Sequence, residues 1–319
     1  MNKPNVVFMG TPEFSVATLA AMLDNGVQVV GVITAPDKPA GRGQKISMSA
    51  VKKFALEKNL PLLQPTNLKD PHFLQDLEAL KPDLQVVVAF RMLPEAVWKL
   101  PKLGTFNLHA SLLPQYRGAA PINWAIINGE NETGITTFFL QQEIDTGAII
   151  FQEKLPIGPD ENAGSLHDRL MKAGASLVVR TVDAISNGEV KPIQQAELLS
   201  SAGLLQPAPK LHRENTRINW YQSTAVVYNL IRGLSPYPAA HTTLKNGVSI
   251  DCKIYRAAPH VTTHPNSPGL IETDQKSYLH VFTADGYLDI LELQLSGKQK
   301  MGVRDLLNGY KFIPGASFA

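Results

Sequence analysis

Apolar and polar positions along the first 190 residues follow two patterns, short strand-like runs and longer segments with helical spacing. The strand-like runs are Val6–Met9, Val27–Thr34, Leu84–Phe90, Thr105–His109 and Gly134–Gln142. Leu84–Phe90 lacks clean alternation, which is typical of a parallel strand covered on both faces. Strands interleaved with helices predict an α/β fold with a Rossmann-like, doubly wound, mostly parallel sheet.

Capping and turn residues predict where the helices of this region begin and end. Thr11 can cap a helix that has Pro12 at its first position and that ends at Asn25-Gly26. Ser165 is predicted to open a longer helix, which stops at Asn187-Gly188. The alternation of strands and helices therefore continues to about residue 189.

The pattern changes after that point. Residues 190–209 lose periodicity and are rich in turn-forming residues, which predicts a linker. One helix is expected over Ser223–Gly233, and residues 240–312 alternate short strands with turns, which is typical of a small, OB-like β-barrel. We therefore predict an N-terminal domain over 1–189 and a C-terminal β-barrel domain over 210–319.

Charge divides unevenly along the chain. The first 206 residues carry 18 Lys and Arg against 20 Asp and Glu, a net charge of −2, whereas residues 207–319 carry 12 against 8, a net charge of +4, with five of the eight histidines. A basic C-terminal half fits a polyanionic partner such as RNA.

No apolar run reaches the roughly 18–20 residues that a membrane span needs, and the N-terminus lacks the pattern of a signal peptide. These features predict a cytoplasmic protein that does not enter a membrane. Nothing in the sequence requires more than a monomer.

Three common kinds of site are not expected. The single cysteine, Cys252, excludes an internal disulfide and lies in an alternating stretch typical of a strand, although a lone cysteine can also be a nucleophile. No metal site is predicted, because the only H-x-x-x-H pair, His260 and His264, lies between prolines that disfavour a helix. Gly10-Thr11-Pro12 follows the first strand, but the G-x-G-x-x-G of a dinucleotide-binding oxidoreductase is absent.

Asn107 and His109 are the first candidate for chemistry. They are two positions apart on a predicted strand, so their side chains share a face, near the strand end where open α/β sheets bind ligands. An amide and an imidazole aimed at one point can hold a carbonyl oxygen as it becomes an oxyanion. A satisfied polar pair at a sheet edge is the alternative interpretation.

Asp145 is the second candidate. It lies in the turn Glu143-Ile144-Asp145-Thr146-Gly147, between two strand-like runs. Its carboxylate can simply hydrogen-bond the local backbone of that turn. Alternatively, it can orient a histidine or take a proton from an amine.

The segment from Pro36 to Lys45 is the third candidate. It is too rich in proline and glycine to form a helix, and it contains Lys38, Arg42 and Lys45. These cations can bind phosphates. A solvated loop without a ligand is the other interpretation.

Taken together, these segments resemble the folate-dependent formyltransferase family over nearly the whole chain. Val7–Phe14 resembles the opening strand and turn of that family, Asn107–Pro114 followed by Tyr116-Arg117-Gly118 resembles its signature loop, and Ile144–Gly147 resembles its second active-site segment. The joint occurrence of these motifs, in this order and spacing, is highly specific. It favours the functional interpretation of each of them.

Two further features are similar to the branch of the family that acts on methionyl-tRNA. One is the segment from Pro36 to Lys45, which is thereby implied to contact the acceptor arm. The other is the C-terminal domain, with Arg217-Ile218-Asn219-Trp220 and the run from Ile231 to Pro238. The resemblance implies transfer of formyl from the co-substrate 10-formyltetrahydrofolate to the methionine amino group of initiator tRNA in translation initiation, without a metal.

The resemblance also implies roles for particular residues. The catalytic residues would be Asn107, His109 and Asp145. The folate would lie against two segments, whose implied contacts are Ser111, Leu112, Leu113 and Pro114 in one and Phe90 and Leu93 in the other. Arg91 departs from the family, which usually has glycine there, and a long cation near the folate pocket either points outward or changes the pterin contacts.

Several alternatives remain open from the sequence. A related enzyme could formylate an amino-sugar nucleotide or hydrolyse formyltetrahydrofolate with the same active-site residues. An RNA-binding protein with an inactive catalytic domain is a second alternative, although Asn107, His109 and Asp145 occur together. Within a formyl transfer, Ser111 could form an acyl intermediate in place of direct transfer between two bound substrates.

Overall fold

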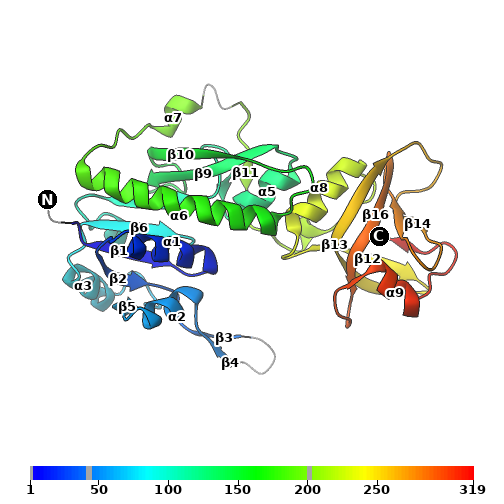
Figure 1. Ribbon diagram of the computed structural model, residues 1–319, viewed down its shortest axis with the longest axis horizontal. Helices are drawn as coiled ribbons and strands as arrows, with labels where there is room; N and C mark the ends of the chain where they lie inside the picture. The colour runs from blue at the N-terminus through cyan, green and yellow to red at the C-terminus, as the bar shows by residue number, and fades with distance from the viewer. Residues whose placement is uncertain (1–2, 41–44, 200–202) are drawn as a thin grey trace. The chain divides into compact units, whose positions relative to one another are not determined.

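Two apolar runs of the N-terminal region form adjacent parallel strands, β1 (Val6–Gly10) and β6 (Leu84–Val88), and every residue of both is buried. They lie near the centre of a seven-stranded sheet with the order β10-β9-β7-β6-β1-β2-β5. The computed structural model describes residues 3–40, 45–199 and 203–319 (Figure 1). The other strands of this sheet are β2 (Val29–Ile33), β5 (Leu62–Leu63), β7 (Thr105–His109), β9 (Glu132–Phe139) and β10 (Ile149–Pro156).

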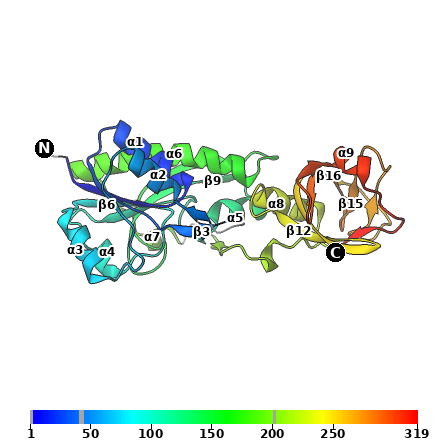
Figure 2. The ribbon, with the colours of Figure 1, turned by 90° about the horizontal axis from the view of Figure 1, so that it is seen from below.

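The strands β5, β2, β1, β6 and β7 are parallel, and β9 runs antiparallel to β7. Helices cover both faces of the sheet, with α1 and α6 on one side and α3 and α4 on the other (Figure 2). The helices of this region are α1 (Glu13–Asp24), α2 (Ala50–Glu57), α3 (Pro71–Ala79), α4 (Glu95–Trp98) and α6 (Ala163–Asn187). The predicted Rossmann-like, mostly parallel architecture is confirmed.

The predicted helix ends are correct, but two predicted caps are wrong. Pro12 is itself the N-cap of α1, with extended backbone and no side-chain cap, so Thr11 lies outside the helix. The helix α6 begins before Ser165, because Asn162 Oδ1 accepts a hydrogen bond from the Ser165 backbone N–H at 2.9 Å. Asparagine and serine are equally good N-cap residues, so the sequence alone did not show which of Asn162 and Ser165 begins the helix.

An antiparallel sheet with the order β14-β15-β16-β13-β12-β18 follows in the C-terminal part of the chain. Leu270, beside β14, pairs with Ser317 of β18, and this bridge joins the two edges of the sheet into a nearly closed barrel. The strands are β12 (Ala240–Asn246), β13 (Val248–Val261), β14 (Ile271–Glu272), β15 (His280–Phe282), β16 (Gly286–Leu295), β17 (Met301–Gly302) and β18 (Ser317–Phe318). The predicted barrel is confirmed.

Three helical elements accompany this barrel, η1 (Glu214–Thr216), α8 (Thr224–Leu234) and α9 (Val303–Gly309). Ser223 caps α8 by accepting from the Val226 N–H, close to the predicted helix start. A further helix, α5 (Pro121–Ile127), packs on α8, where Asn123 Nδ2 donates to the Gly233 carbonyl at 2.7 Å. A Cβ on Gly233 would lie 2.6 Å from Ile127, so glycine permits this close approach.

The chain divides into two compact units. The N-terminal unit comprises Met1–Gly118, Gly134–Leu155 and Asp168–Pro207, and the C-terminal unit comprises Ala119–Thr133, Pro156–His167 and Ala208–Ala319. Segments that precede the predicted linker thus lie in the C-terminal unit. The domain boundaries at residues 189 and 210 stay a prediction.

The segment expected to be a linker contains ordered elements. It carries the short helix α7 (Gln195–Leu198) and the strand β11 (Pro207–Ala208), which pairs with β8 (Arg117–Gly118). Gln195 is only 2% exposed. The local sequence does not predict these elements, because the contacts that order the segment come from residues far away along the chain.

Cys252 is buried within β13, as predicted for a strand residue. Its burial raises the pKa of its thiol to about 12, so the thiol is not ionised near neutral pH. A nucleophilic role is therefore disfavoured, because the thiolate is the reactive form. Within the part of the chain that the structure describes, no helix is both long and apolar enough to cross a membrane.

Candidate active site

The strand β7 places Asn107 and His109 on one face of the sheet. It lies between β6 and β9, with Asn107 opposite Phe138 and His109 opposite Thr136. Side chains two positions apart on a strand point to the same side. The expected juxtaposition of the amide and the imidazole is therefore present at the carboxyl end of β7.

The side-chain oxygen of Asn107 is buried and has no hydrogen-bond partner among the described residues. Leaving a buried polar atom without a partner typically costs about 1–3 kcal/mol. Buried polar groups in native structures are almost always paired, and an exception calls for an explanation. An amide kept for a ligand is such an explanation, and because the unpaired oxygen is an acceptor, it fits an N–H group of a ligand.

His109 is 6% exposed, and its two ring nitrogens face different groups. Nε2 lies 2.8 Å from the backbone carbonyl of Tyr116. Because a carbonyl oxygen can only accept, Nε2 carries the hydrogen and donates it. In the neutral ring Nδ1 then holds the lone pair, and it lies 3.8 Å from Asp145 Oδ2.

The distance of 3.8 Å from His109 to Asp145 is too long for a hydrogen bond, but short enough for electrostatic attraction once the ring is protonated. The same carboxylate oxygen accepts a hydrogen bond from the Gly118 backbone N–H at 2.9 Å. Asp145 is thus tied to the loop that also supplies the Tyr116 carbonyl. The arrangement leaves His109 Nδ1 able to take a proton beside a fixed negative charge.

The turn between β9 and β10 holds Asp145 in a left-handed conformation, with a φ of 54°. Such a conformation is uncommon for residues other than glycine and persists where surrounding contacts impose it. Gly147 makes the turn possible, because a Cβ there would lie 1.6 Å from the Phe139 carbonyl oxygen. The predicted tight turn is confirmed.

The loop after β7 is held by polar side chains of the neighbouring strands. Thr136 Oγ1 donates to the Ser111 carbonyl at 2.7 Å and accepts from the Leu113 N–H at 3.2 Å. Gln152 Nε2 donates to the Leu113 carbonyl at 2.8 Å. These bonds fix the backbone of the loop against the sheet.

The side chains predicted to touch the folate divide into buried and half-buried ones. Leu112 and Phe90 are half-buried, whereas Ser111, Leu113, Pro114 and Leu93 are buried. Leu113 packs on Phe138 and Ile149, and Leu93 packs in the core of the N-terminal unit.

Ser111 is poorly placed for an acyl intermediate. Its side chain is fully buried, and its hydroxyl donates to the Gln115 carbonyl at 2.6 Å. A serine nucleophile needs access to the substrate and a base that accepts its proton. The geometry therefore favours direct transfer between two bound substrates.

Arg91 is exposed, and its guanidinium donates to the backbone carbonyls of Thr66, at 2.9 Å, and of Pro65. These bonds tie Arg91 to the segment before α3. Its guanidinium is thus held by backbone carbonyls of that segment.

The cation-rich segment near residue 40 forms a short hairpin. Its strands are β3 (Lys38–Ala40) and β4 (Lys45–Ser47), and Lys38 is exposed. Asp37, just before β3, pairs with Lys52 at 2.6 Å and accepts from Gln64, and these contacts lower the pKa of its carboxyl. The third predicted cation, Arg42, lies outside the described residues.

Sequence reasoning missed Gln195, which connects the signature loop to the turn of Asp145. Its Oε1 accepts from the Arg117 guanidinium, and its Nε2 donates to the carbonyls of Asp145 and Gly147. No spacing or motif marks this glutamine, because its partners lie about 50 and 78 residues earlier. Only the folded chain brings these groups together.

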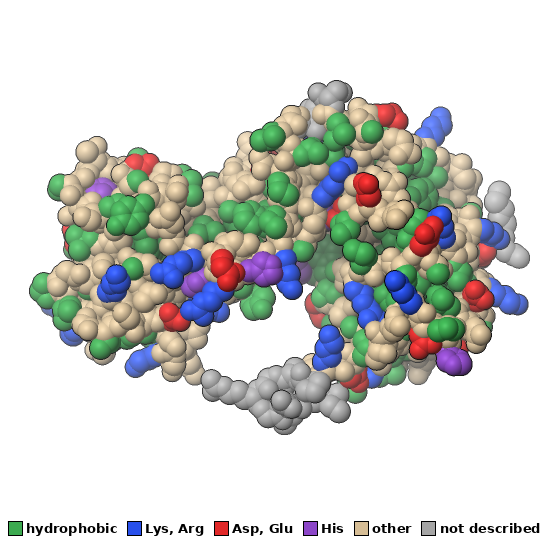
Figure 3. All heavy atoms as spheres, turned by 180° about the vertical axis from the view of Figure 1, so that it is seen from behind, with side chains coloured by type: hydrophobic (Ala, Val, Ile, Leu, Met, Phe, Trp, Pro, Cys, Tyr) green, Lys and Arg blue, Asp and Glu red, His purple; other side chains and the backbone are tan. Residues whose placement is uncertain are grey.

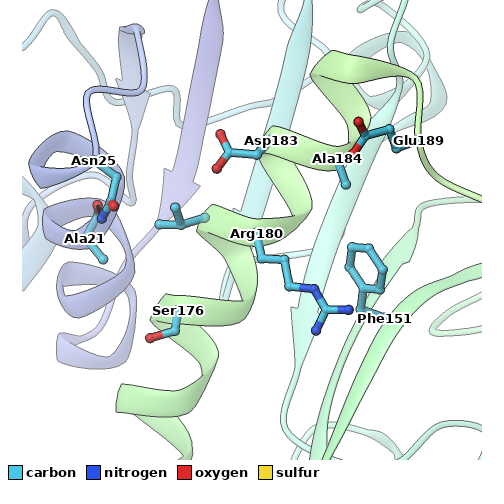
Figure 4. Close-up of a pocket in the computed structure, with 9 residues that line it drawn as sticks. Ala21, Asn25, Phe151, Ser176, Arg180, Asp183, Ala184 and Glu189 are labelled. Atoms are coloured by element: carbon cyan, nitrogen blue, oxygen red, sulfur yellow. Dashed lines mark hydrogen bonds between the residues drawn. The ribbon is translucent and has the colours of Figure 1, made fainter.

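A hollow in the N-terminal unit lies apart from these residues. Arg180 of α6 lies 4.2 Å from the ring centre of Phe151 on β10, and Asn25 lies across from them (Figure 4). None of the predicted site residues lines this hollow. We therefore place the candidate active site at the carboxyl end of β7.

Comparison with known proteins identifies the class to which this fold and site belong. A family model described as formyl transferase matches residues 4–182, and a model of the formyl transferase C-terminal domain matches residues 210–311. The chain belongs to the formyl transferase family.

Within this family, the chain is 55% identical to the methionyl-tRNA formyltransferase of Bacteroides fragilis, over 96% of this chain and 94% of that protein. It is 53% identical to the methionyl-tRNA formyltransferase of Flavobacterium johnsoniae, over 98% of each. A crystallised sugar 3N-formyl transferase, studied in the presence of dTDP and 5-N-formyl-THF, shares the fold with a TM-score of 0.64. That protein is 23% identical, and the match covers 94% of this chain and all of the other.

Proposed function

We propose that this chain transfers the formyl group of 10-formyltetrahydrofolate to the amino group of methionine on initiator tRNA. The observation that carries the proposal is the setting of His109, which donates through Nε2 to the Tyr116 carbonyl and turns Nδ1 towards Asp145. The names and near full-length similarity of the relatives support the choice of substrates.

Asn107 would stabilise the charge that develops when the methionine amine attacks the formyl carbon. The C=O double bond of the formyl group becomes a single bond to an oxyanion, and the Asn107 amide donates a hydrogen bond to it. The side-chain oxygen of Asn107 has no hydrogen-bond partner among the described residues, so its amide is free to orient the NH2 group, which is the donor, towards the formyl oxygen.

His109 would move the proton. Nδ1 accepts it from the attacking amine, and the imidazolium is stabilised by Asp145, 3.8 Å away. His109 then returns the proton to the departing folate nitrogen as the carbon–nitrogen bond breaks and the C=O bond re-forms. One proton and one formyl group thus change places between the two nitrogens, and His109 ends as it began.

The folate would bind where the chain leaves β6 and β7. These strands are parallel neighbours, and Phe90 and Ser111 each follow the end of one by two residues. Loops at the carboxyl ends of adjacent parallel strands form the usual ligand crevice of this kind of sheet. The half-buried Phe90 and Leu112 supply apolar surface for a pterin.

We propose that the tRNA is held by cations of both units. Lys38 lies on β3 and Lys45 on β4, with Arg42 between them in the sequence, and residues 207–319, which make up most of the C-terminal unit, carry a net charge of +4. Figure 3 shows Lys, Arg and His side chains gathered over part of that unit. Such side chains bind phosphates without reading bases.

The test is formyl transfer from 10-formyltetrahydrofolate to methionyl initiator tRNA, with methionyl elongator tRNA as the control. We expect product on the initiator tRNA only, which would show that the enzyme reads the tRNA body as well as methionine. If neither tRNA is formylated while the folate loses its formyl group, the acceptor is an amino-sugar or water and the proposal is wrong.

A further inference from the structure

We propose that Gln195 is a positioning residue for the transfer reaction, which holds together the two backbone segments that orient His109. The inference rests on the proposed function and adds a residue from outside the known motifs. Gln195 lies in the segment that the sequence predicts to be a linker. The segments that it joins carry the two partners of His109, the Tyr116 carbonyl and the Asp145 carboxylate.

Gln195 uses every hydrogen-bonding position of its amide. Nε2 donates to the carbonyls of Asp145 and Gly147, at 2.8 and 2.9 Å. Oε1 accepts from Nε and from a terminal nitrogen of the Arg117 guanidinium, at 3.0 and 2.5 Å. An amide offers two donors and two acceptor lone pairs, and all four are paired here.

The segments joined by Gln195 are those whose backbone needs support. Asp145 and Tyr116 have φ values of 54° and 58°, in the left-handed region that residues with a side chain rarely occupy. Gln195 bonds the carbonyl of Asp145 directly, and Arg117 is the residue after Tyr116. The contacts of Gln195 therefore support the left-handed backbone at Asp145 directly and at Tyr116 through the adjacent Arg117.

Backbone hydrogen bonds on both sides of α7 hold Gln195 in this position. Ile193 pairs with Ile149 of β10 through two backbone hydrogen bonds, of 2.8 and 2.9 Å. On the other side of α7, the Gln206 carbonyl accepts from the Tyr116 N–H at 2.7 Å. Gln195 itself is 2% exposed, so its bonds are shielded from competing water.

Loss of the amide would move the carboxylate of Asp145 relative to His109 without removing either group. A misplacement of about 1 Å in an active site can lower a rate roughly 10²-fold. Substrate binding would change little, because Gln195 contacts the backbone of the turn and the Arg117 side chain, neither of which belongs to the predicted folate or tRNA contacts.

The experiment compares Gln195→Met and Gln195→Glu with Gln194→Met. Methionine has nearly the shape of glutamine but makes none of the four bonds, and glutamate keeps the acceptors and loses both donors. Gln194 is the exposed neighbour at the N-cap position of α7, and its side chain makes no capping hydrogen bond. The kcat and the KM for each substrate are measured with each purified, full-length variant.

We expect kcat to fall roughly 10²-fold in Gln195→Met, with both KM values within about twofold of the original protein, and kcat to fall in Gln195→Glu as well. Gln194→Met should keep the original kcat. A kcat of Gln195→Met equal to that of Gln194→Met would overturn the proposal, as would equal losses in kcat and in both substrate affinities.

A second measurement needs no substrate. Ring ¹⁵N shifts of histidine-labelled protein report the tautomer of His109, whose signal is assigned by its loss in His109→Asn. We expect the form protonated at Nε2 in the original protein and in Gln194→Met, and a mixture in Gln195→Met. An unchanged tautomer in a folded Gln195→Met protein would contradict the inference, whereas failure of the proposed function would be seen in the original protein's activity.

Discussion

At the scale of single residues, the half-buried amide of Asn107 is a candidate for a role in catalysis rather than in stability. Its side-chain oxygen is buried and lacks a hydrogen-bond partner among the described residues. By contrast, the hydroxyl of Thr136, which lies opposite His109, donates to the Ser111 carbonyl and accepts from Gln152. A residue selected only for packing would be apolar here. We therefore propose that a ligand, rather than the fold, accounts for this amide.

Replacing Asn107 by alanine should lower kcat roughly 10²–10³-fold, because removing one oxyanion donor typically costs about 2.7–4 kcal/mol of transition-state stabilisation. Steady-state kinetics on methionyl initiator tRNA measures the change. The matched control is Asn308→Ala, at an exposed position of α9. A variant of Asn107 that keeps its rate would remove this residue from the proposed role.

At the scale of elements, the turn between β9 and β10 depends on a glycine that brings two backbones together. Gly147→Ala would place a methyl group within 1.6 Å of the Phe139 carbonyl oxygen, so the turn must shift. We expect the free energy of unfolding to fall by about 1–3 kcal/mol, the usual cost of overpacking. Because Asp145 lies in the same turn, activity should fall further than stability explains.

Chemical denaturation and formyl-transfer assays at a temperature where the variant is folded separate the two effects. Gly309→Ala is the control, since a Cβ at Gly309 meets nothing within 4 Å. A Gly147→Ala protein with original stability would show that the turn is more adaptable than its geometry indicates.

At the scale of the whole molecule, the uneven charge along the chain bears on how a large substrate is held. The net charge of residues 207–319 is +4, whereas that of residues 1–206 is −2. Phosphate contacts release condensed counterions, so tRNA affinity should fall steeply as salt rises.

With about four phosphate contacts, a rise from 50 to 200 mM salt should weaken tRNA binding on the order of 10²-fold. Filter binding or fluorescence titration with initiator tRNA measures this slope, and the KM for the folate over the same range is the control. A tRNA affinity that does not respond to salt would count against the predicted contacts of Lys38, Arg42 and Lys45.

The sequence by itself determined the features that short stretches encode. The strongly apolar runs of β1 and β6, the glycines after α1 and α6, and the alternating strands of the barrel all predicted the right elements. Spacing along β7 also placed Asn107 and His109 on one face, because the geometry of a strand is local.

Only the tertiary structure decided how His109 is oriented. The Tyr116 carbonyl, the left-handed backbone of Asp145 and the buried amide of Gln195 meet there from three separate segments. The contacts of Asp145 and Gln195 pair groups far apart in sequence, and no local pattern indicates these pairings. The fold brings them together because the strands and turns that carry them are fixed by burial elsewhere, and this long-range packing sets the site.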